Sequence, residues 1–197
     1  GLFSDPAVEP AQADEQPASA SEPAGEDQDP KVNEAMALID QAHDVFKKGD
    51  YPQAQKLAEK ALELLPDDRV LHEVRALTLF AQGLYGDAAA AVYAVLASGP
   101  NWDWATLRSF YPDTATFTNQ LRKLEAAMRA DPKSADTRFL LAYFYLTMNQ
   151  VEPALKMLAQ AKELLPDDQL IPAIINALKP DDSKQAEGEA PPSAQAG

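Results

Sequence analysis

The chain of 197 residues contains no cysteine, and this absence excludes several kinds of chemistry at once. Disulfide bonds, thiolate metal sites and thiol catalysis all require cysteine. Histidine is almost as scarce, since only His43 and His72 are present. The sequence also lacks a glycine-rich phosphate loop, a serine nucleophile motif and a zinc-protease motif. We therefore expect no enzymatic activity and no cofactor.

Metal-ligand candidates are equally few. Asp40, His43 and Asp44 share one face of a predicted helix, a spacing that could hold a metal ion. An acid and a histidine three residues apart are more often local surface electrostatics. We therefore expect no metal site.

Long apolar runs and surplus positive charge are also missing. The longest apolar run, residues 88–97, has ten residues, about half of what crosses a bilayer. Lysine and arginine number 17 against 31 acids, a formal charge of −14, whereas nucleic acid binding requires a positive surface that replaces counterions. We therefore expect neither membrane insertion nor nucleic acid binding. The chain begins with Gly1 rather than methionine, which is compatible with a signal or anchor upstream.

Most of the negative charge lies in two end segments rich in proline and alanine. Residues 1–30 hold eight acids and no base, and residues 181–197 hold four acids and one lysine. Segments this polar cannot bury enough apolar surface to offset their ordering entropy. We therefore expect a disordered linker at 1–30 and a disordered tail at 181–197. The domain predicted between them, residues 31–180, is nearly balanced, with 19 acids and 16 bases.

This central region repeats itself with a period of about 34 residues. Prolines that end alanine- and leucine-rich runs recur at spacings of 34, 32 and 34 residues: Pro66, Pro100, Pro132 and Pro166. Apolar residues within each unit recur every three or four positions, which predicts helices, and Gly49 followed by Pro52 predicts a break between the two helices of the first unit. Each unit is therefore predicted to be an antiparallel helix pair. The predicted units are 35–68, 69–100, 101–134 and 135–168, followed by a capping helix at 169–179.

Small residues at fixed positions indicate the type of repeat. The first unit, with Ala42, Gly49-Asp50-Tyr51, Ala54, Ala61 and Pro66, resembles the tetratricopeptide repeat. The same pattern recurs as Ala76, Gly83, Tyr85, Ala88 and Pro100 in the second unit and as Ala142, Tyr145, Ala154, Ala161 and Pro166 in the fourth. The third unit is two residues short and has Phe110-Tyr111-Pro112-Asp113 in place of the glycine turn, so its first helix is expected to be truncated. The resemblance implies an all-α, right-handed solenoid of four helix-turn-helix repeats, the third degenerate, with a C-terminal capping helix.

The resemblance also implies where a partner binds. In this family the first helix of each pair lines a concave surface, so we expect a scaffold whose apolar and aromatic groove binds a protein or peptide segment. The predicted groove residues are Met36, Ile39, His43, Phe46, Val70, Glu73, Leu77, Phe80, Trp104, Asp136, Phe139, Tyr143 and Leu146. Glu73 and Asp136 are expected to select a basic residue in the partner. An alternative is that several of these side chains pack between repeats.

The resemblance argues against one familiar mode of recognition. Arrays that clamp a C-terminal carboxylate carry lysine and asparagine at some groove positions. This sequence has Ile39, His43 and Val74 instead. We therefore expect no such clamp.

Two apolar clusters leave a second hypothesis open. Five of the fifteen aromatic residues lie between Trp102 and Phe117, where they either form a binding hot spot or fill the volume left by the shortened helix. The capping helix carries a wide apolar stripe: Leu170, Ile171, Ile174, Ile175 and Leu178. This stripe either packs on the fourth repeat or contacts another copy or domain, so the alternative function is a self-association or docking module. A monomer is the favoured expectation and a homodimer its alternative.

The third unit, together with residues 138–143, resembles bacterial tetratricopeptide proteins that carry envelope-type low-complexity segments. This resemblance implies no particular activity. It favours an extracytoplasmic or envelope-associated location over a cytoplasmic one.

Overall fold

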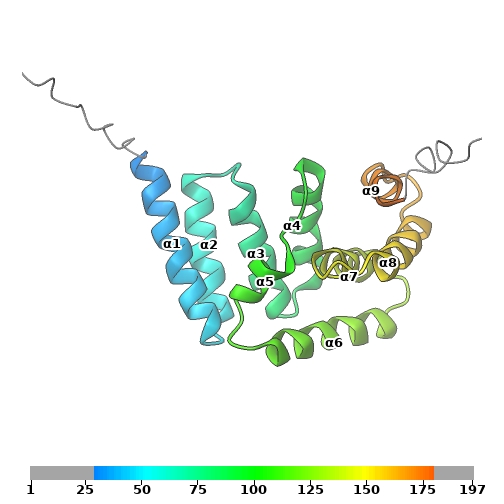
Figure 1. Cartoon of the computed structure of the whole chain (residues 1–197), viewed down its shortest axis with the longest axis horizontal. Helices are drawn as coiled ribbons and strands as arrows, with labels where there is room; N and C mark the ends of the chain where they lie inside the picture. Colours follow the sequence, from blue (N-terminus) through cyan, green and yellow to red (C-terminus); the bar gives the residue numbers. More distant parts are fainter. Residues whose placement is uncertain (1–28, 180–197) are drawn as a thin grey trace, which may run out of the picture.

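A computed structural model describes residues 29–179, and this part of the chain forms nine α-helices and no strand (Figure 1). The helices are α1 (Pro30–Lys47), α2 (Tyr51–Leu64), α3 (Arg69–Ala81), α4 (Tyr85–Ser98), α5 (Trp104–Ser109), α6 (Thr114–Ala130), α7 (Ala135–Thr147), α8 (Val151–Leu164) and α9 (Leu170–Leu178). The predicted disordered segments 1–30 and 181–197 lie outside the described residues, except for Asp29 and Pro30, which begin α1.

Local sequence sets where these helices begin and end. Five helices have an aspartate at the N-cap whose side chain accepts a hydrogen bond from a backbone N–H of the first turn. These residues are Asp29, Asp50, Asp68, Asp103 and Asp113. Gly49 and Gly83 have φ angles of 84° and 80° in the turns within the first two pairs, a left-handed conformation that glycine adopts without steric cost. Asn149, with φ 56°, takes the same role in the turn between α7 and α8.

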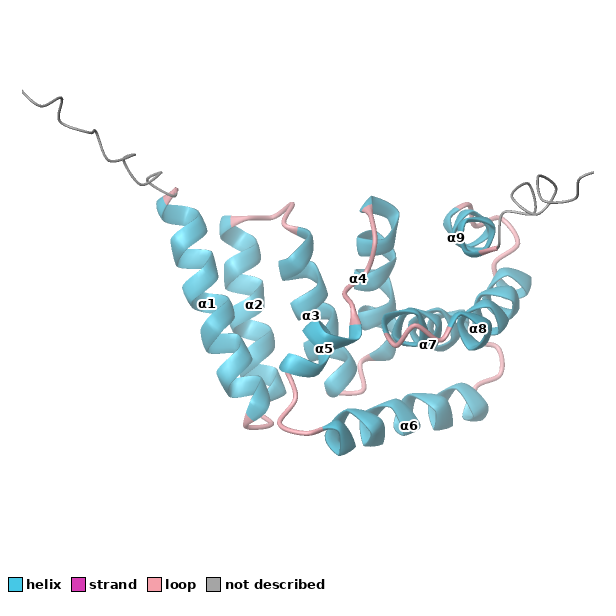
Figure 2. Ribbon diagram, viewed as in Figure 1, coloured by secondary structure: helices cyan, strands magenta, loops and turns pink. Residues whose placement is uncertain are grey.

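Three helix pairs, α1–α2, α3–α4 and α7–α8, are the most closely packed elements of the described region. Ala54, Ala88 and Ala154 lie at the same position of the second helix in each pair, and each is 0% exposed. An alanine at this position lets the two helices approach closely, because protein interiors leave no room for a longer side chain there. The predicted all-helical repeat array is thus confirmed (Figure 2).

The third repeat departs from this pairing. Its first helix, α5, has only six residues, as its degenerate sequence predicted. It crosses in front of α3 in Figure 1, and it does not pack closely with α6, which runs along the lower edge beneath α7. As a result, α4 packs directly against α7. The close stacking therefore passes from the second repeat to the fourth.

One large hydrophobic cluster extends from α1 to α9. Aromatic rings occupy its centre, where Phe80 lies 4.2 Å from Phe144 and 6.2 Å from Phe117, measured between ring centroids. A smaller cluster of Ala35, Ala61 and Leu71 lies between the first two repeats. These contacts distribute the stability along the array, as expected for stacked repeats.

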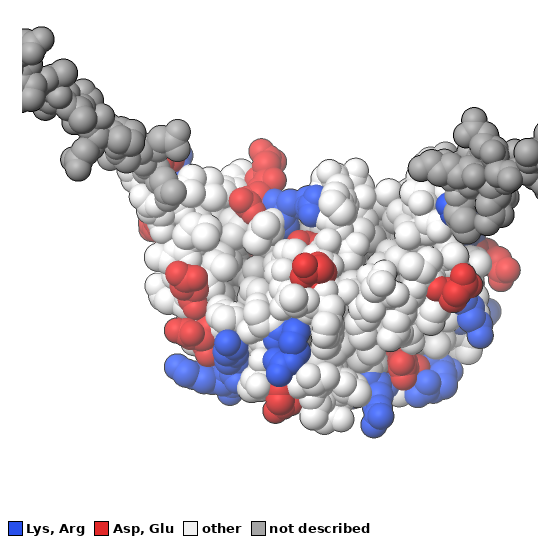
Figure 3. Space-filling view, viewed as in Figure 1, with Lys and Arg blue, Asp and Glu red and all other residues white. Residues whose placement is uncertain are grey.

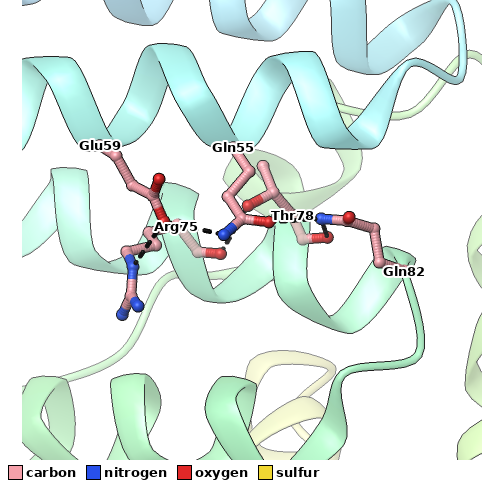
Figure 4. A network of polar contacts seen from close by, with 5 residues as sticks. All are labelled: Gln55, Glu59, Arg75, Thr78 and Gln82. Atoms are coloured by element: carbon pink, nitrogen blue, oxygen red, sulfur yellow. Dashed lines mark hydrogen bonds and ion pairs between the residues drawn. The ribbon is translucent and has the colours of Figure 1, made fainter.

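A chain of polar contacts also joins α2 to α3 (Figure 4). The side-chain amide of Gln82 donates to Gln55 Oε1 over 2.8 Å, and Gln55 donates to Glu59 over 2.8 Å. Glu59 in turn lies 3.5 Å from the guanidinium of Arg75. Because the side chains of Arg75 and Glu59 are 33% and 42% exposed, the contribution of this ion pair to stability is small. The network fixes the orientation of the two repeats rather than supplying much energy.

Candidate protein-binding site

The structure divides the thirteen predicted groove residues between the interior and the surface. Six are at most 4% exposed: Phe46, Glu73, Leu77, Phe80, Phe139 and Tyr143. Met36 and Val70 are the most accessible apolar members, at 55% and 51% exposed. Asp136 is exposed, and the remaining four are half-buried: Ile39, His43, Trp104 and Leu146. A groove that binds a partner stays a prediction, limited to these accessible side chains.

The groove of the first two repeats is covered by the chain itself, through residues 99–111, which we call the covering segment. The ring of Phe110 meets His43 edge-on, with centroids 4.8 Å apart. The ring of Tyr111 lies 5.1 Å from Phe46 at an interplanar angle of 90°. Both arrangements are favourable edge-to-face contacts. The first helices of the array therefore pack on their own third repeat.

Hydrogen bonds tie the covering segment to other helices along its length. The Arg69 guanidinium donates a hydrogen bond to the carbonyl of Pro100, and the Asn101 side-chain amide donates one to Thr147 Oγ1 over 2.9 Å. The Trp102 N–H donates to Glu73 Oε1 over 3.0 Å. The His43 Nε2 atom lies 2.8 Å from the carbonyl oxygen of Ser109. These bonds come from α1, α3 and α7. Three of them pair a backbone group of the covering segment: the carbonyls of Pro100 and Ser109 and the N–H of Trp102.

Glu73 is the central polar residue of this arrangement. Its Oε1 accepts hydrogen bonds from the Trp102 N–H and from the Tyr143 hydroxyl, the latter over 3.1 Å. Its Oε2 is buried without a partner. Burial raises the pKa of Glu73 above its ordinary value, against the opposing effects of these two hydrogen bonds and of Arg69. Glu73 thus serves an internal contact, and of the two acids expected to select a basic partner only Asp136 is exposed.

The energy of burial shows that the covering segment belongs to the core. Leu107, Phe110 and Tyr111 are each at most 8% exposed. Burying a large apolar side chain contributes about 1.5–3 kcal/mol, so burial of these three contributes roughly 5–9 kcal/mol before the entropy cost of ordering them. A partner that displaced the covering segment would have to offset this burial. The buried rings of Phe110, Tyr111 and Phe117 occupy the space beside the short helix.

A separate concavity lies where α4, α7 and α9 meet, and we call it the α4–α7 pocket. Its volume is about 290 Å³, and its lining residues are Ala89, Ala90, Tyr93, Ala135, Asp136, Phe139, Leu165 and Ile171. It exists because α4 packs directly on α7, without the third repeat between them. Asp136 and Phe139 belong to the predicted groove, so the structure brings these two together at one opening. Figure 3 shows that, on the face in view, charged side chains lie in small groups separated by broad uncharged areas.

Polar contacts fix the walls of the α4–α7 pocket. The Tyr93 ring lies 5.5 Å from Phe139, and its hydroxyl donates to Asp168 Oδ2 over 2.9 Å. The other carboxylate oxygen of Asp168 accepts the Ile171 N–H over 2.8 Å at the first turn of α9. Burial, followed by the contact with Asp168, raises the pKa of Tyr93 above its ordinary value. Asp168 thereby holds α9 against α4.

The α4 side of the pocket has almost no signature in the sequence. Ala89, Ala90 and Tyr93 lie on the second helix of their pair, which in a regular array faces away from the concave surface. The one indication in the sequence is the run of four alanines at 88–91, which provides no long side chain to cover this part of the helix. The pocket depends on the contact between α4 and α7, which no local pattern encodes.

The capping-helix stripe packs largely on the protein itself. Ile171 is fully buried. The other four members are half-buried against the main hydrophobic cluster: Leu170, Ile174, Ile175 and Leu178. Self-association through α9 stays a prediction.

The described residues contain no group of three or more acidic or histidine side chains placed to hold a metal ion. Both histidines bond to backbone carbonyls, His43 to Ser109 over 2.8 Å and His72 to Pro66 over 2.7 Å. Within residues 29–179, no helix combines the length and the apolar character that a bilayer span requires.

Comparisons with known proteins agree with this architecture. A family model described as tetratricopeptide repeat matches residues 39–101, and a second with the same description matches residues 121–178. No curated protein sequence matches the chain.

Similar solved structures include the Sgt2 TPR domain from Aspergillus fumigatus, at 15% identity and a TM-score of 0.35, with 83% of this chain and 89% of that chain covered. A MamA RS-1 ArsTM double mutant is 21% identical, with 79% and 90% covered and a TM-score of 0.35. MamA 41-end from Desulfovibrio magneticus RS-1 is 19% identical, with 79% and 87% covered and the same TM-score.

Proposed function

Because the chain belongs to the tetratricopeptide repeat family, whose domains generally mediate protein–protein interactions, we propose that it is a non-catalytic scaffold that holds a protein segment in the α4–α7 pocket. The observation that supports this proposal is an apolar opening of about 290 Å³ between packed helices. This volume is at the lower end of ligand pockets. It suits one or two side chains of a peptide segment.

The walls of the pocket are preorganised for such a segment. Phe139 is buried on α7, Ala89 is buried on α4, and the Tyr93–Asp168 hydrogen bond fixes α9. The ordering cost of binding therefore falls on the ligand, and we expect an affinity in the micromolar range. Leu165, 41% exposed at the rim, provides a further apolar contact.

The accessible part of the predicted groove extends this proposal. Met36 and Val70 occupy equivalent positions on α1 and α3, and both side chains are more than half exposed. Ile39 lies one turn after Met36 and is half-buried. In our proposal these residues contact more distant parts of a long partner segment, whereas the α4–α7 pocket holds the anchor.

Filling the pocket tests the proposal. Ala90 is exposed on α4 and lines the pocket, so Ala90→Trp places an indole ring inside it. Ala126→Trp makes the same change at an exposed position of α6 that does not line the pocket. The full chain is used to select binders from a phage-displayed library of random dodecapeptides. We expect selected peptides to bind the wild type and Ala126→Trp, and to lose at least about tenfold in affinity for Ala90→Trp.

Circular dichroism melting curves of both variants serve as the folding control. If no peptide is enriched over several rounds, or if the enriched peptides bind Ala90→Trp as tightly as Ala126→Trp, the pocket is not the binding site and the proposal is wrong.

A further inference from the structure

A second concavity opens between the covering segment and the C-terminal end of α7, and we call it the tryptophan pocket. Its volume is about 520 Å³, and the lining side chains that decide its chemistry are Trp102, Asp103, Trp104, Leu146, Met148 and Asn149. The four apolar side chains in this set are half-buried, so each keeps part of its surface accessible. Trp104 and Leu146 belong to the predicted groove, so the structure brings these two groove residues together at this opening.

The two indole rings of the tryptophan pocket are held in place by the core. The Trp102 ring stacks on buried Phe110, with centroids 5.2 Å apart and an interplanar angle of 19°. The backbone N–H of Trp102 also donates to Glu73 Oε1 over 3.0 Å. The Trp104 ring lies 5.2 Å from the ring of buried Phe117. A ligand therefore does not have to order these rings when it binds.

The electrostatics of the tryptophan pocket favour a positive charge. Among the described residues, Asp103 is the only charged side chain that lines it, and this side chain is exposed. Hydrogen bonds from Thr106 lower the pKa of Asp103 below its ordinary value, so its carboxylate is ionised at neutral pH. The last residues of α7 also line the pocket, and a helix C-terminus carries the negative end of the helix dipole. The last turn of α7 has no basic side chain of its own.

Two arginines contact the covering segment, but neither lines the tryptophan pocket. The Arg69 guanidinium donates to the carbonyl of Pro100. The Arg108 guanidinium donates to Thr114 Oγ1 over 2.9 Å and to the carbonyl of Tyr111 over 2.8 Å. No lining side chain of the described region therefore supplies the positive charge that this pocket favours.

A guanidinium suits the tryptophan pocket better than an ammonium group does. It is planar and stacks on aromatic rings, and indole is the aromatic group that attracts cations most strongly. It also pairs with a carboxylate through two parallel N–H donors, and the exposed side chains of Asp103 and Asn149 provide acceptor oxygens. The methylene stem of an arginine can pack on Leu146 and Met148.

From this arrangement we infer that the tryptophan pocket binds an arginine side chain of a partner protein segment, with the guanidinium against the indole rings and paired with Asp103. The inference goes beyond the proposed function, because it assigns a ligand chemistry to a different opening of the chain. Its failure would leave the α4–α7 pocket, which the Ala90→Trp comparison tests, unaffected.

The chain has only two tryptophans and both line this pocket, so their indole N–H signals in an NMR spectrum report on this site alone. The ¹⁵N-labelled full chain is titrated with three peptides of the form acetyl-Gly-Xaa-Gly-amide, in which Xaa is arginine, citrulline or lysine. Citrulline has the shape of arginine without its charge, and lysine has the charge without the planar group.

We expect the arginine peptide to shift at least one indole signal saturably, and to bind at least about threefold more tightly than the citrulline and lysine peptides. If neither indole signal shifts, or if the citrulline or lysine peptide binds as tightly as the arginine peptide, the inference is overturned.

A pair of matched variants tests the role of Asp103. Asp103→Asn removes the charge from the pocket, and asparagine is as good an N-cap as aspartate, so the start of α5 is kept. Asp113→Asn makes the same change at the N-cap of α6, where the exposed carboxylate accepts the Thr116 N–H over 2.7 Å and does not line the pocket. Backbone amide spectra of both variants serve as the folding control.

We expect Asp103→Asn to weaken binding of the arginine peptide about two- to fivefold, and Asp113→Asn to leave it within about 1.5-fold. Equal effects of the two variants would reduce the interaction to the overall charge of the protein and overturn the inference.

Discussion

Glu73 has an unusual position for a carboxylate, since its Oε2 is buried in the described region without a hydrogen-bond partner. Its other oxygen joins the Trp102 N–H of the covering segment to the Tyr143 hydroxyl of α7. A single side chain therefore connects the second, third and fourth repeats. Burial opposes the ionisation of Glu73, so the contribution of this side chain to the free energy of unfolding depends on pH.

The Glu73→Gln variant tests this pH dependence. A folded-state pKa above the ordinary value of 4.5 means that the folded protein binds the proton more tightly than the unfolded chain. The contribution of this pKa shift to the free energy of unfolding is fully present when the pH is below the ordinary pKa of glutamate. It is lost as the pH rises through the raised pKa of Glu73 in the folded protein. Glutamine keeps the accepting oxygen but does not titrate. We therefore expect the free energy of unfolding of Glu73→Gln to rise relative to the wild type as the pH increases from about 4 to 7.

Urea denaturation of both proteins across this pH range measures the difference. A difference that stays constant, or that falls as the pH rises, would show that burial does not control the ionisation of Glu73.

At the scale of helices, the paired elements depend on one small residue each. Ala88→Leu should overpack the α3–α4 contact and lower the free energy of unfolding by about 1–3 kcal/mol, because Ala88 is 0% exposed. Ala94→Leu, at an exposed position of the same helix, should change it by no more than about 0.5 kcal/mol. Chemical denaturation of the two variants provides the comparison. Similar effects of both substitutions would contradict the observed register of α4.

The covering segment makes a different prediction at the same scale. Phe110→Ala removes a buried ring that contacts His43, and we expect a loss of about 3–5 kcal/mol in the free energy of unfolding. Ser109→Ala, next to it but exposed, should cost no more than about 0.5 kcal/mol. Denaturation curves again measure both. A loss below about 1 kcal/mol for Phe110→Ala would show that the segment is only loosely attached to the groove.

The helices themselves could be predicted because their signals are local. The Asp50 carboxylate caps α2 by accepting a hydrogen bond from the Gln53 N–H, three residues further along the chain. Gly49 supplies the positive φ angle of the turn before α2. The position of the covering segment could not be predicted in this way. It depends on contacts such as Glu73 with Trp102 and His43 with Ser109, which are 29 and 66 residues apart in the chain. Helical periodicity shows which face a side chain occupies, but not what packs on that face.

At the scale of the whole molecule, the short third repeat shapes the surface. Because α5 lies over the first repeats, α7 packs against α4 and the α4–α7 pocket opens beside them. Asp136 and Phe139 could be predicted from their repeat positions, but Ala90 and Tyr93 could not, because they face the pocket only when the second and fourth repeats are neighbours. The repeat pattern thus predicted a protein-binding function and two residues of the proposed site, whereas the location of the open surface required the structure.

The absence of cysteine makes the most direct measurement simple, since one introduced thiol carries one environment-sensitive fluorophore. Acrylodan is attached to Ala90→Cys at the α4–α7 pocket and, as the control, to Ala126→Cys on α6. The tightest binder from the dodecapeptide library is then titrated into each labelled protein. We predict a saturable shift in emission for Ala90→Cys and none for Ala126→Cys. A shift of equal size at both positions, or peptide binding that leaves the emission of the Ala90→Cys label unchanged, would contradict the assignment of this pocket as the protein-binding site.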